Sequence, residues 1–264
     1  MHQFLSRPDR HLSLCGNLRA AVVERAVSGA PAFMRGLRAV FACDFHAVPR
    51  TTPEDFRALG DQIRGLKPDL ILLGGDYSDS AEGALRLFGG TGPLDAPLGC
   101  FGVLGNNDRE AWPALKPLRR AMAAAGCRLL VNESARIRLA GGTLVLAGLD
   151  DAVYGDPRPA GLYPGKPSEI CYRIVLFHEP SPVRPAPDLM LCGHTHGGQF
   201  NLLGLTPYTI GFERWFGQHR VDVLGVAGWQ DADGARVLVS KGIGASRIPL
   251  RVGVRPEIEL LRFE

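Results

Sequence analysis

The chain has 264 residues, of which 45% are hydrophobic and 22% are charged, and its formal net charge is +3. A chain of this length and composition is expected to form one sizeable folded domain, which excludes disorder throughout. The small net charge and the absence of any run of like charges argue against a nucleic-acid partner.

The start of the chain and the cysteines indicate the subcellular location to expect for the protein. The first forty residues hold no apolar stretch of the roughly 18 residues that a membrane span requires, and charged residues interrupt them. The six cysteines form no CxxC pair, so a disulfide framework is not expected. We expect a cytoplasmic protein, with a peripheral position at the inner membrane as the variant, and leave the oligomeric state open.

Five short apolar runs dominate the pattern, and each ends in a polar residue that can bind a metal. The runs are 38–43 before Asp44 and His46, 68–75 before Asp76, 99–105 before Asn106, 172–177 before His178, and 188–193 before His194 and His196. Runs of this length, rich in branched apolar residues and bounded by glycine or proline, predict buried strands.

Helices are expected between these strands. Thr52 and Pro53 suit the N-cap and first position of a helix that ends near residue 66. A second helix is expected over 110–126, bent at Pro113 and Pro117. Later runs at 143–150, 236–244 and 257–263 predict further strands, in a second sheet. This alternation indicates an α/β domain over 1–264, with an extension over 1–36, core motifs at 38–199 and C-terminal strands at 236–264.

The carboxyl ends of the strands are where polar groups gather in such folds. Taken singly, each motif is weak, because Asp-x-His pairs and Gly-Gly-Asp turns are common at protein surfaces. The segment GHTHGGQ at 193–199 is stronger, since its glycines let two imidazoles turn toward neighbouring metal positions. The ordered set of all five motifs, rather than any one, indicates a metal site.

The same motifs carry a family resemblance. Asp44-x-His46, Gly75-Asp76, Gly105-Asn106-x-Asp108, His178 and Gly193-His194-x-His196 resemble those of the calcineurin-like metallophosphoesterases, from about residue 38 to 199. HTHGGQ and the tail GIGASRIPLRVGVRPEIELL resemble a bacterial branch with membrane-associated phosphodiesterases and one type of UDP-2,3-diacylglucosamine pyrophosphatase. The resemblance implies a four-layer α/β/β/α sandwich of two mixed sheets flanked by helices.

It also implies two metal ions. One would be held by Asp44, His46, Asp76 and His196, and the other by Asp76, Asn106, His178 and His194, with Asp76 bridging. A hydroxide shared by both ions would attack the phosphorus of a phosphodiester or pyrophosphate. Imidazoles beside carboxylate and amide oxygens suit transition metals, so manganese is expected, with iron, zinc, cobalt and nickel as alternatives.

One position departs from the family pattern. Many relatives carry histidine after the metal-binding asparagine, where this chain has Asn107. A neutral amide can donate a hydrogen bond to a phosphoryl oxygen but cannot act as a general acid. We expect Asn107 to contact phosphate and the enzyme to favour leaving groups that need little protonation.

Further residues are candidates for supporting roles. Asp79 could orient a metal-binding histidine, or it could be a carboxylate at a helix N-terminus. Asp108 could likewise orient a ligand, or it could be a helix cap. Asp150 and Asp151 are expected in a turn. Substrate contacts are expected from Asn107, Trp215 and Arg247. Trp215 lies in an aromatic cluster that also contains the cations Arg214 and Arg220 and the aromatic residues Tyr208, Phe212 and Phe216. Lys241 and Arg251 are further candidates, either as phosphate ligands or as surface charges.

The predicted function is therefore metal-dependent hydrolysis of a small-molecule or lipid-linked phosphate, with peripheral membrane contact left open. A UDP-2,3-diacylglucosamine pyrophosphatase is the most specific alternative. A nuclease is weaker, because no basic stripe with interleaved aromatics is visible. A non-catalytic metal-binding scaffold is the alternative of another class, although every ligand position is filled.

Overall fold

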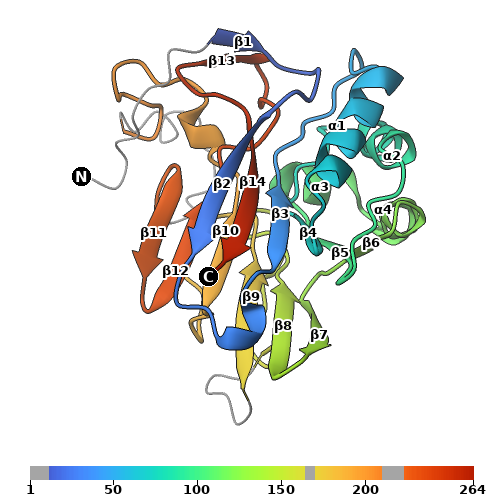
Figure 1. Cartoon of the computed structure of the whole chain (residues 1–264). Helices are drawn as coiled ribbons and strands as arrows, with labels where there is room; N and C mark the ends of the chain where they lie inside the picture. Colours follow the sequence, from blue (N-terminus) through green and yellow to red (C-terminus); the bar gives the residue numbers. More distant parts are fainter. Residues whose placement is uncertain (1–11, 164–169, 210–222) are drawn as a thin grey trace.

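Two six-stranded mixed sheets pack against each other at the centre of the fold, as Figure 1 shows for the computed structural model. The structure describes residues 12–163, 170–209 and 223–264. The first sheet has the order β2 (Ala21–Val27), β14 (Glu257–Phe263), β3 (Arg38–Ala42), β4 (Leu70–Leu73), β5 (Cys100–Gly102) and β6 (Cys127–Leu129). The second has the order β11 (Gly228–Ala232), β12 (Ala235–Val239), β10 (Leu189–Cys192), β9 (Cys171–Leu176), β8 (Gly142–Gly148) and β7 (Glu133–Leu139).

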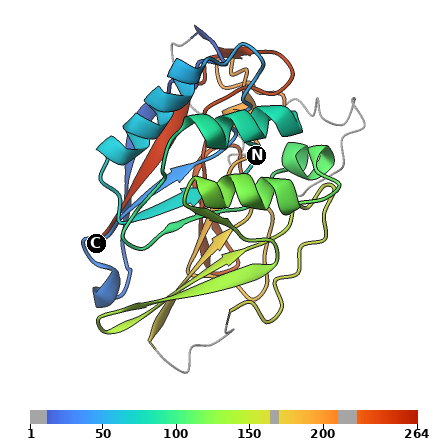
Figure 2. The same ribbon diagram turned by 90° about the vertical axis from the view of Figure 1, so that its right-hand side faces the viewer.

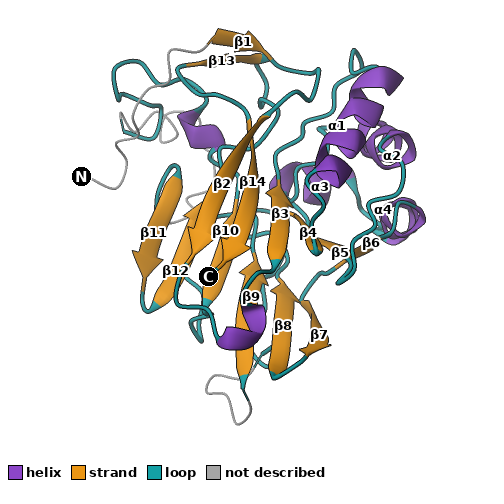
Figure 3. Ribbon diagram, viewed as in Figure 1, coloured by secondary structure: helices purple, strands orange, loops and turns teal. Residues whose placement is uncertain are grey.

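Four α-helices cover the outer face of the first sheet (Figures 2 and 3). They are α1 (Pro53–Gly65), α2 (Ala81–Gly90), α3 (Asn106–Ala111) and α4 (Lys116–Ala124). As predicted, α1 begins with Thr52 as N-cap and Pro53 in its first turn, and Asp55 completes a capping box with Thr52. Phe56, Leu59 and Ile63 then recur at helical spacing and pack on the strands.

The space between the sheets is filled by apolar side chains from both. Phe41 and Leu72 of the first sheet and Leu146, Ile174 and Leu191 of the second lie in one buried cluster. Strands β3, β4 and β10 are buried on both faces, which is why each reads as a continuous apolar run rather than an alternating one.

The predicted α/β sandwich of two mixed sheets flanked by helices is confirmed. In the described part of the chain, loops rather than helices cover the outer face of the second sheet. Leu149, Tyr163, Phe177 and Val183 lie in these loops and pack on a cluster that includes Val175. Within the same described ranges, no helix is long and apolar enough to cross a membrane.

Two predicted details were wrong. The strand predicted at 257–263 does not join the second sheet but lies in the first, between β2 and β3, while β9 and β10 belong to the second. The predicted bent helix over 110–126 is two helices, α3 and α4, separated at Trp112–Leu115. Pro113 explains the break, because proline has no N–H to donate and disfavours helical backbone at the preceding residue.

Truncation of Leu191 tests the contact between the sheets. Its side chain is 0% exposed, and Leu191→Ala should lower the free energy of unfolding by about 2–5 kcal/mol, because it leaves a cavity in the shared core. Leu203→Ala is the matched control, since Leu203 is 94% exposed and should change stability by less than about 0.5 kcal/mol. Urea unfolding with a chelator present measures both, and equal effects would contradict this account of the core.

Candidate functional site

The seven predicted metal-binding residues follow the ends of five strands. Asp44 and His46 come after β3, Asp76 after β4 and Asn106 after β5, all in the first sheet. His178 follows β9, and the pair His194 and His196 follows β10, both in the second sheet. Because β3, β4 and β5 are parallel neighbours, and β9 and β10 are also parallel, each sheet presents its ligand residues at one edge.

Backbone hydrogen bonds hold these strand ends together. The N–H of Asp44 donates to the carbonyl of Gly75 at 2.9 Å, and the N–H of His46 donates to that of Asp76 at 3.0 Å. In the second sheet, the N–H of Gly193 donates to the carbonyl of His178 at 2.9 Å. The loops are therefore a hydrogen-bonded layer rather than independent turns.

The backbone of the site is unusual. Left-handed conformations occur at five of the ligand residues, namely Asp44, His46, Asp76, His194 and His196. Such a conformation costs a non-glycine residue about 1–2 kcal/mol, and such residues cluster where function constrains the chain. A side chain on Gly193 or Gly242 would collide with the Asp44 carboxylate, so both positions require glycine.

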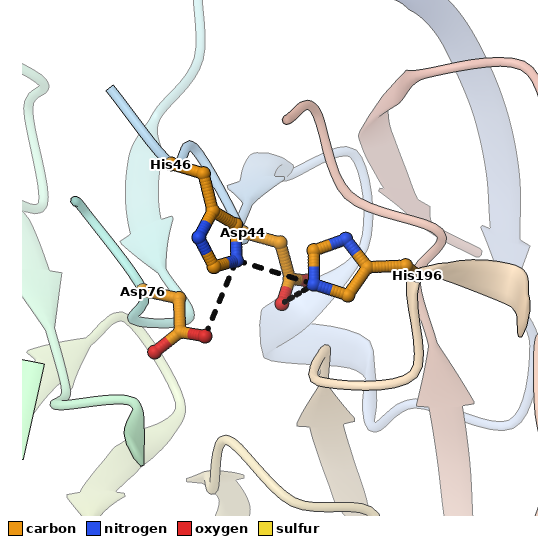
Figure 4. Close-up of side chains that lie close together, drawn as sticks. All are labelled: Asp44, His46, Asp76 and His196. Atoms are coloured by element: carbon orange, nitrogen blue, oxygen red, sulfur yellow. Dashed lines mark hydrogen bonds and ion pairs between the residues drawn. The ribbon is translucent and has the colours of Figure 1, made fainter. Parts of the chain in front are cut away.

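The first group of ligand atoms converges on a small buried volume (Figure 4). His46 Nε2 lies 3.2 Å from His196 Nε2 and 3.3 Å from Asp76 Oδ2. His196 Nε2 lies 3.6 Å from Asp44 Oδ1. One ligand atom from each of these four residues lies within 4.8 Å of all the others. Two imidazoles and two carboxylates at this spacing form a donor set that suits a divalent transition metal.

The second group lies on the other side of Asp76. His178 Nε2 is 3.4 Å from Asp76 Oδ2, and His194 Nδ1 is 3.0 Å from Asn106 Oδ1. The same Asp76 oxygen therefore faces His46 in one group and His178 in the other. His178 Nδ1 donates to the carbonyl of Gly74 at 2.7 Å, while its Nε2 is buried without a hydrogen-bond partner. An unpartnered imidazole nitrogen among carboxylate oxygens fits a metal ligand.

The pKa values reflect buried negative charge. Burial alone would lower the pKa of His46, but its contacts with Asp76 and Asp79 raise it to about 10. The pKa of His178 is likewise well above its ordinary value, because Asp76 outweighs the effect of burial. Burial would raise the pKa of Asp76, yet the two imidazoles hold it well below its usual range. The carboxylates thus favour positive charge beside them, which divalent cations would supply.

Two neighbouring side chains, Asp79 and Asp108, help to fix the orientation of these groups. The carboxylate of Asp79 contacts His46 Nδ1 and leaves Nε2 facing the site. Asp108 accepts hydrogen bonds from the N–H groups of Asp76 at 2.7 Å and Gly105 at 2.9 Å, so it ties the loop after β4 to the start of α3. Asp108 also caps α3, which is one of the two alternatives considered for it from the sequence, and its role in orienting ligands stays a prediction.

Arg251 corrects a prediction. Its side chain is 0% exposed and therefore is neither a surface charge nor a ligand for incoming phosphate. Its Nη2 lies 3.1 Å from His196 Nδ1, and its Nε donates to the carbonyl of Gly244 at 2.6 Å. The other candidate cation, Lys241, lies 3.5 Å from Glu257. Asp150 and Asp151 accept backbone hydrogen bonds from the turn that follows them, as predicted.

A pocket of about 500 Å³ is lined in part by four of the predicted metal-binding residues, Asp76, Asn106, His194 and His196. Asn107 lies in its wall, where its N–H and its amide Nδ2 donate to the two oxygens of Asp76 at 3.0 and 2.7 Å. Arg247 also lines the pocket, and its contact with substrate stays a prediction. Trp215, Phe212, Phe216, Arg214 and Arg220 lie outside the described residues.

Sequence reasoning missed several pocket residues. Tyr154, Phe200 and Ile248 give the pocket an apolar side, and Glu110 adds a carboxyl group. Ile248 lies in the C-terminal tail that carries part of the family resemblance, and Glu110 lies in α3. These four residues are far apart in the chain, and nothing in the sequence marks them as neighbours. Tyr208, the aromatic member of the predicted cluster that lies within the described residues, is in the pocket wall.

Comparison with known proteins gives a consistent result. The family model described as calcineurin-like phosphoesterase matches residues 37–198. An uncharacterized metallophosphoesterase, YkuE of Bacillus subtilis, is 29% identical over 240 residues, which cover 87% of this chain and 79% of that protein. The phosphodiesterase YaeI of Escherichia coli is 31% identical over 236 residues, covering 85% and 81%. The UDP-2,3-diacylglucosamine pyrophosphatase LpxG of Chlamydia muridarum is 31% identical over 110 residues, covering 35% and 33%.

Replacement of Asp79 tests its role in orienting His46. Asp79→Asn keeps the shape but removes the charge that holds the imidazole, and partners of this kind typically contribute 10–100-fold to metal affinity. We expect Mn²⁺ affinity to fall by about that factor in isothermal titration calorimetry. Asp61→Asn is the control, because Asp61 is an exposed carboxylate that pairs with Arg64 on α1, away from the site. Unchanged Mn²⁺ affinity in Asp79→Asn would show that the carboxylate does not support the site.

Proposed function

The chain belongs to the calcineurin-like phosphoesterase family and is a metal-dependent phosphoester hydrolase, and from this premise we propose that its substrates are phosphodiesters or pyrophosphates. The observation that carries the proposal is the position of Asp76, whose Oδ2 faces His46 on one side and His178 on the other. A carboxylate shared in this way suits two adjacent divalent ions.

The proposed assignment of ligands follows the two groups. One ion would be held by Asp44, His46, Asp76 and His196, and the other by Asp76, Asn106, His178 and His194. Manganese is the proposed metal, with iron, zinc, cobalt and nickel as alternatives, because imidazole ligands disfavour calcium and magnesium. When bound, such ions supply a water of lowered pKa and neutralise charge on the phosphoryl oxygens.

The residues of the chain then explain the proposed substrate class. Asn107 lies beside Asp76 in the pocket wall, where its amide can donate a hydrogen bond to a phosphoryl oxygen. It cannot protonate a departing alkoxide at neutral pH. Arg247, on the same pocket, supplies a positive charge for a phosphate group of the substrate. Good leaving groups, such as a second phosphate or an aryl oxygen, are therefore favoured.

A pyrophosphatase acting on a nucleotide-linked lipid is the second candidate. The likeness to LpxG favours it, although that likeness covers 35% of this chain. The apolar side of the pocket, with Tyr154, Phe200 and Ile248, is consistent with an acylated substrate. The six cysteines are free thiols, which supports the proposal of a reducing, cytoplasmic compartment.

A substrate panel with added Mn²⁺ tests the proposal. It compares an aryl phosphodiester, an aryl monoester, a nucleotide diphosphate sugar and its acylated form. We expect the aryl diester or the anhydrides to be turned over best, and Asp76→Asn to lower kcat/KM at least about a thousandfold because both metal groups lose their shared carboxylate. Asp61→Asn is the control. Absence of turnover across the panel would favour a non-catalytic metal-binding protein.

Asn107→His tests the role of the missing general acid. A histidine at this position could protonate a poor leaving group, a function typically worth about 10²–10⁴-fold. We expect the variant to gain turnover on a simple alkyl phosphate and to change little on an aryl diester. Asn107→Gln, which keeps an amide, is the matched control and should show no such gain. Equal alkyl phosphate turnover in wild type and Asn107→His would contradict the argument.

A further inference from the structure

A two-stranded ribbon next to the pocket has an apolar outer face. Strand β1 (Leu12–Leu14) pairs with β13 (Leu250–Val252) in an antiparallel register that places Leu12 opposite Val252 and Leu14 opposite Leu250. Residues directly opposite each other share a face of such a pair, and alternate residues point to opposite sides. Arg251 points inward to His196, so the four apolar side chains lie on the outer face. Leu12 and Leu14 are each 71% exposed.

A short turn beside the ribbon extends this apolar surface. Phe200 forms a β-bridge with Val252, and Leu202 pairs with Leu205 to close the turn. Leu203, at the tip, is 94% exposed. Six of the ten exposed large hydrophobic residues recorded for the described chain lie in this region: Leu12, Leu14, Leu202, Leu203, Leu205 and Ile248. Single exposed apolar residues are ordinary, but a concentration of them marks an interaction site.

The charged side chains of the three described segments that form this surface all have the same sign. Segments 12–20, 199–209 and 242–256 contain no aspartate or glutamate, and they contain four arginines. Arg251 is buried, whereas Arg19, Arg247 and Arg255 are exposed. A surface that combines exposed leucines with arginines and lacks acids within these segments is complementary to a layer of anionic headgroups over hydrocarbon.

The apolar surface adjoins the mouth of the pocket. Phe200 and Pro207, at the two ends of the turn, line the pocket over His194 and His196, and so does Ile248. Anything seated on the outer face of the ribbon and the turn would therefore lie beside the opening that leads to the metal-binding residues. We propose that this face docks on an anionic lipid bilayer and places the pocket mouth at the level of the headgroups.

A bilayer accounts for the surface better than a second copy of the chain. In a symmetric dimer the same patch would lie on both sides of the interface. That arrangement would bring the exposed arginines of both copies together, and segments 12–20, 199–209 and 242–256 contribute no acidic residue to such an interface. An anionic bilayer offers negative charge to the arginines along with an apolar layer for the leucines.

Vesicle flotation of the full chain tests the proposal. The probes are phosphatidylcholine vesicles with and without phosphatidylglycerol, each at low and high salt. We expect binding to the anionic vesicles and weaker binding at high salt, because salt screens the arginines. Leu203→Glu should lower the vesicle-bound to free ratio at least tenfold, because it places a charge at the tip of the turn. Leu85→Glu is the matched control, since Leu85 is 43% exposed on helix α2, outside this surface, and it should bind like wild type.

Two further measurements separate the outcomes. Hydrolysis of a soluble aryl diester without vesicles should be the same in Leu203→Glu and wild type, so a failure of the proposed chemistry is distinguished from a failure of docking. Size-exclusion chromatography reports self-association. Wild type that does not bind anionic vesicles, Leu203→Glu that binds them normally, or a dimer that this substitution dissociates would each overturn the proposal, the last by assigning the face to a second copy.

Discussion

The carboxylates of Asp44 and Asp76 lie 0% and 1% exposed at the junction of the two sheets. Burial of negative charge is costly unless positive charge lies close to it. The groups within 4 Å of these carboxylates include the imidazoles of His46, His178 and His196, and they are drawn from both sheets. The site therefore forms only when the two sheets are packed in register, and its occupation by cations and the stability of the packed sheets depend on each other.

The surrounding backbone also helps to bring the imidazoles close to the buried carboxylates. Left-handed residues such as Asp76 and His196 turn their side chains into the site, and nearby glycines leave room for the Asp44 carboxylate. Asp108 fastens the loop of Asp76 to the helix that begins with Asn106. The conformational strain is thus offset by hydrogen bonds between neighbouring loops, and these hydrogen bonds also help to position the predicted ligand residues.

The sequence predicted which polar residues converge at the junction of the sheets, and it predicted little of what surrounds them. Asp44 and His194 could be predicted because each directly follows an apolar run, and strand ends converge in α/β folds. The sheet to which each strand belongs could not be predicted, since an apolar run buried on both faces looks alike in either sheet. The strand at 257–263 was misplaced for this reason. Asp79 was recognised as a candidate, but only the structure shows that its carboxylate contacts His46.

Arg251 shows most clearly what the sequence hides and how the site connects to the surface. In isolation an arginine between Leu250 and Val252 reads as a solvated charge or a phosphate ligand. The pairing of β13 with β1 turns Arg251 inward against His196 and its two neighbours outward. One strand thus contributes to the metal-binding side and to the apolar outer face within three residues. The inward and outward positions share one backbone, so the ribbon fixes the distance between the apolar outer face and the predicted metal-binding residues. A bilayer bound to the outer face would therefore lie at a fixed distance from the pocket.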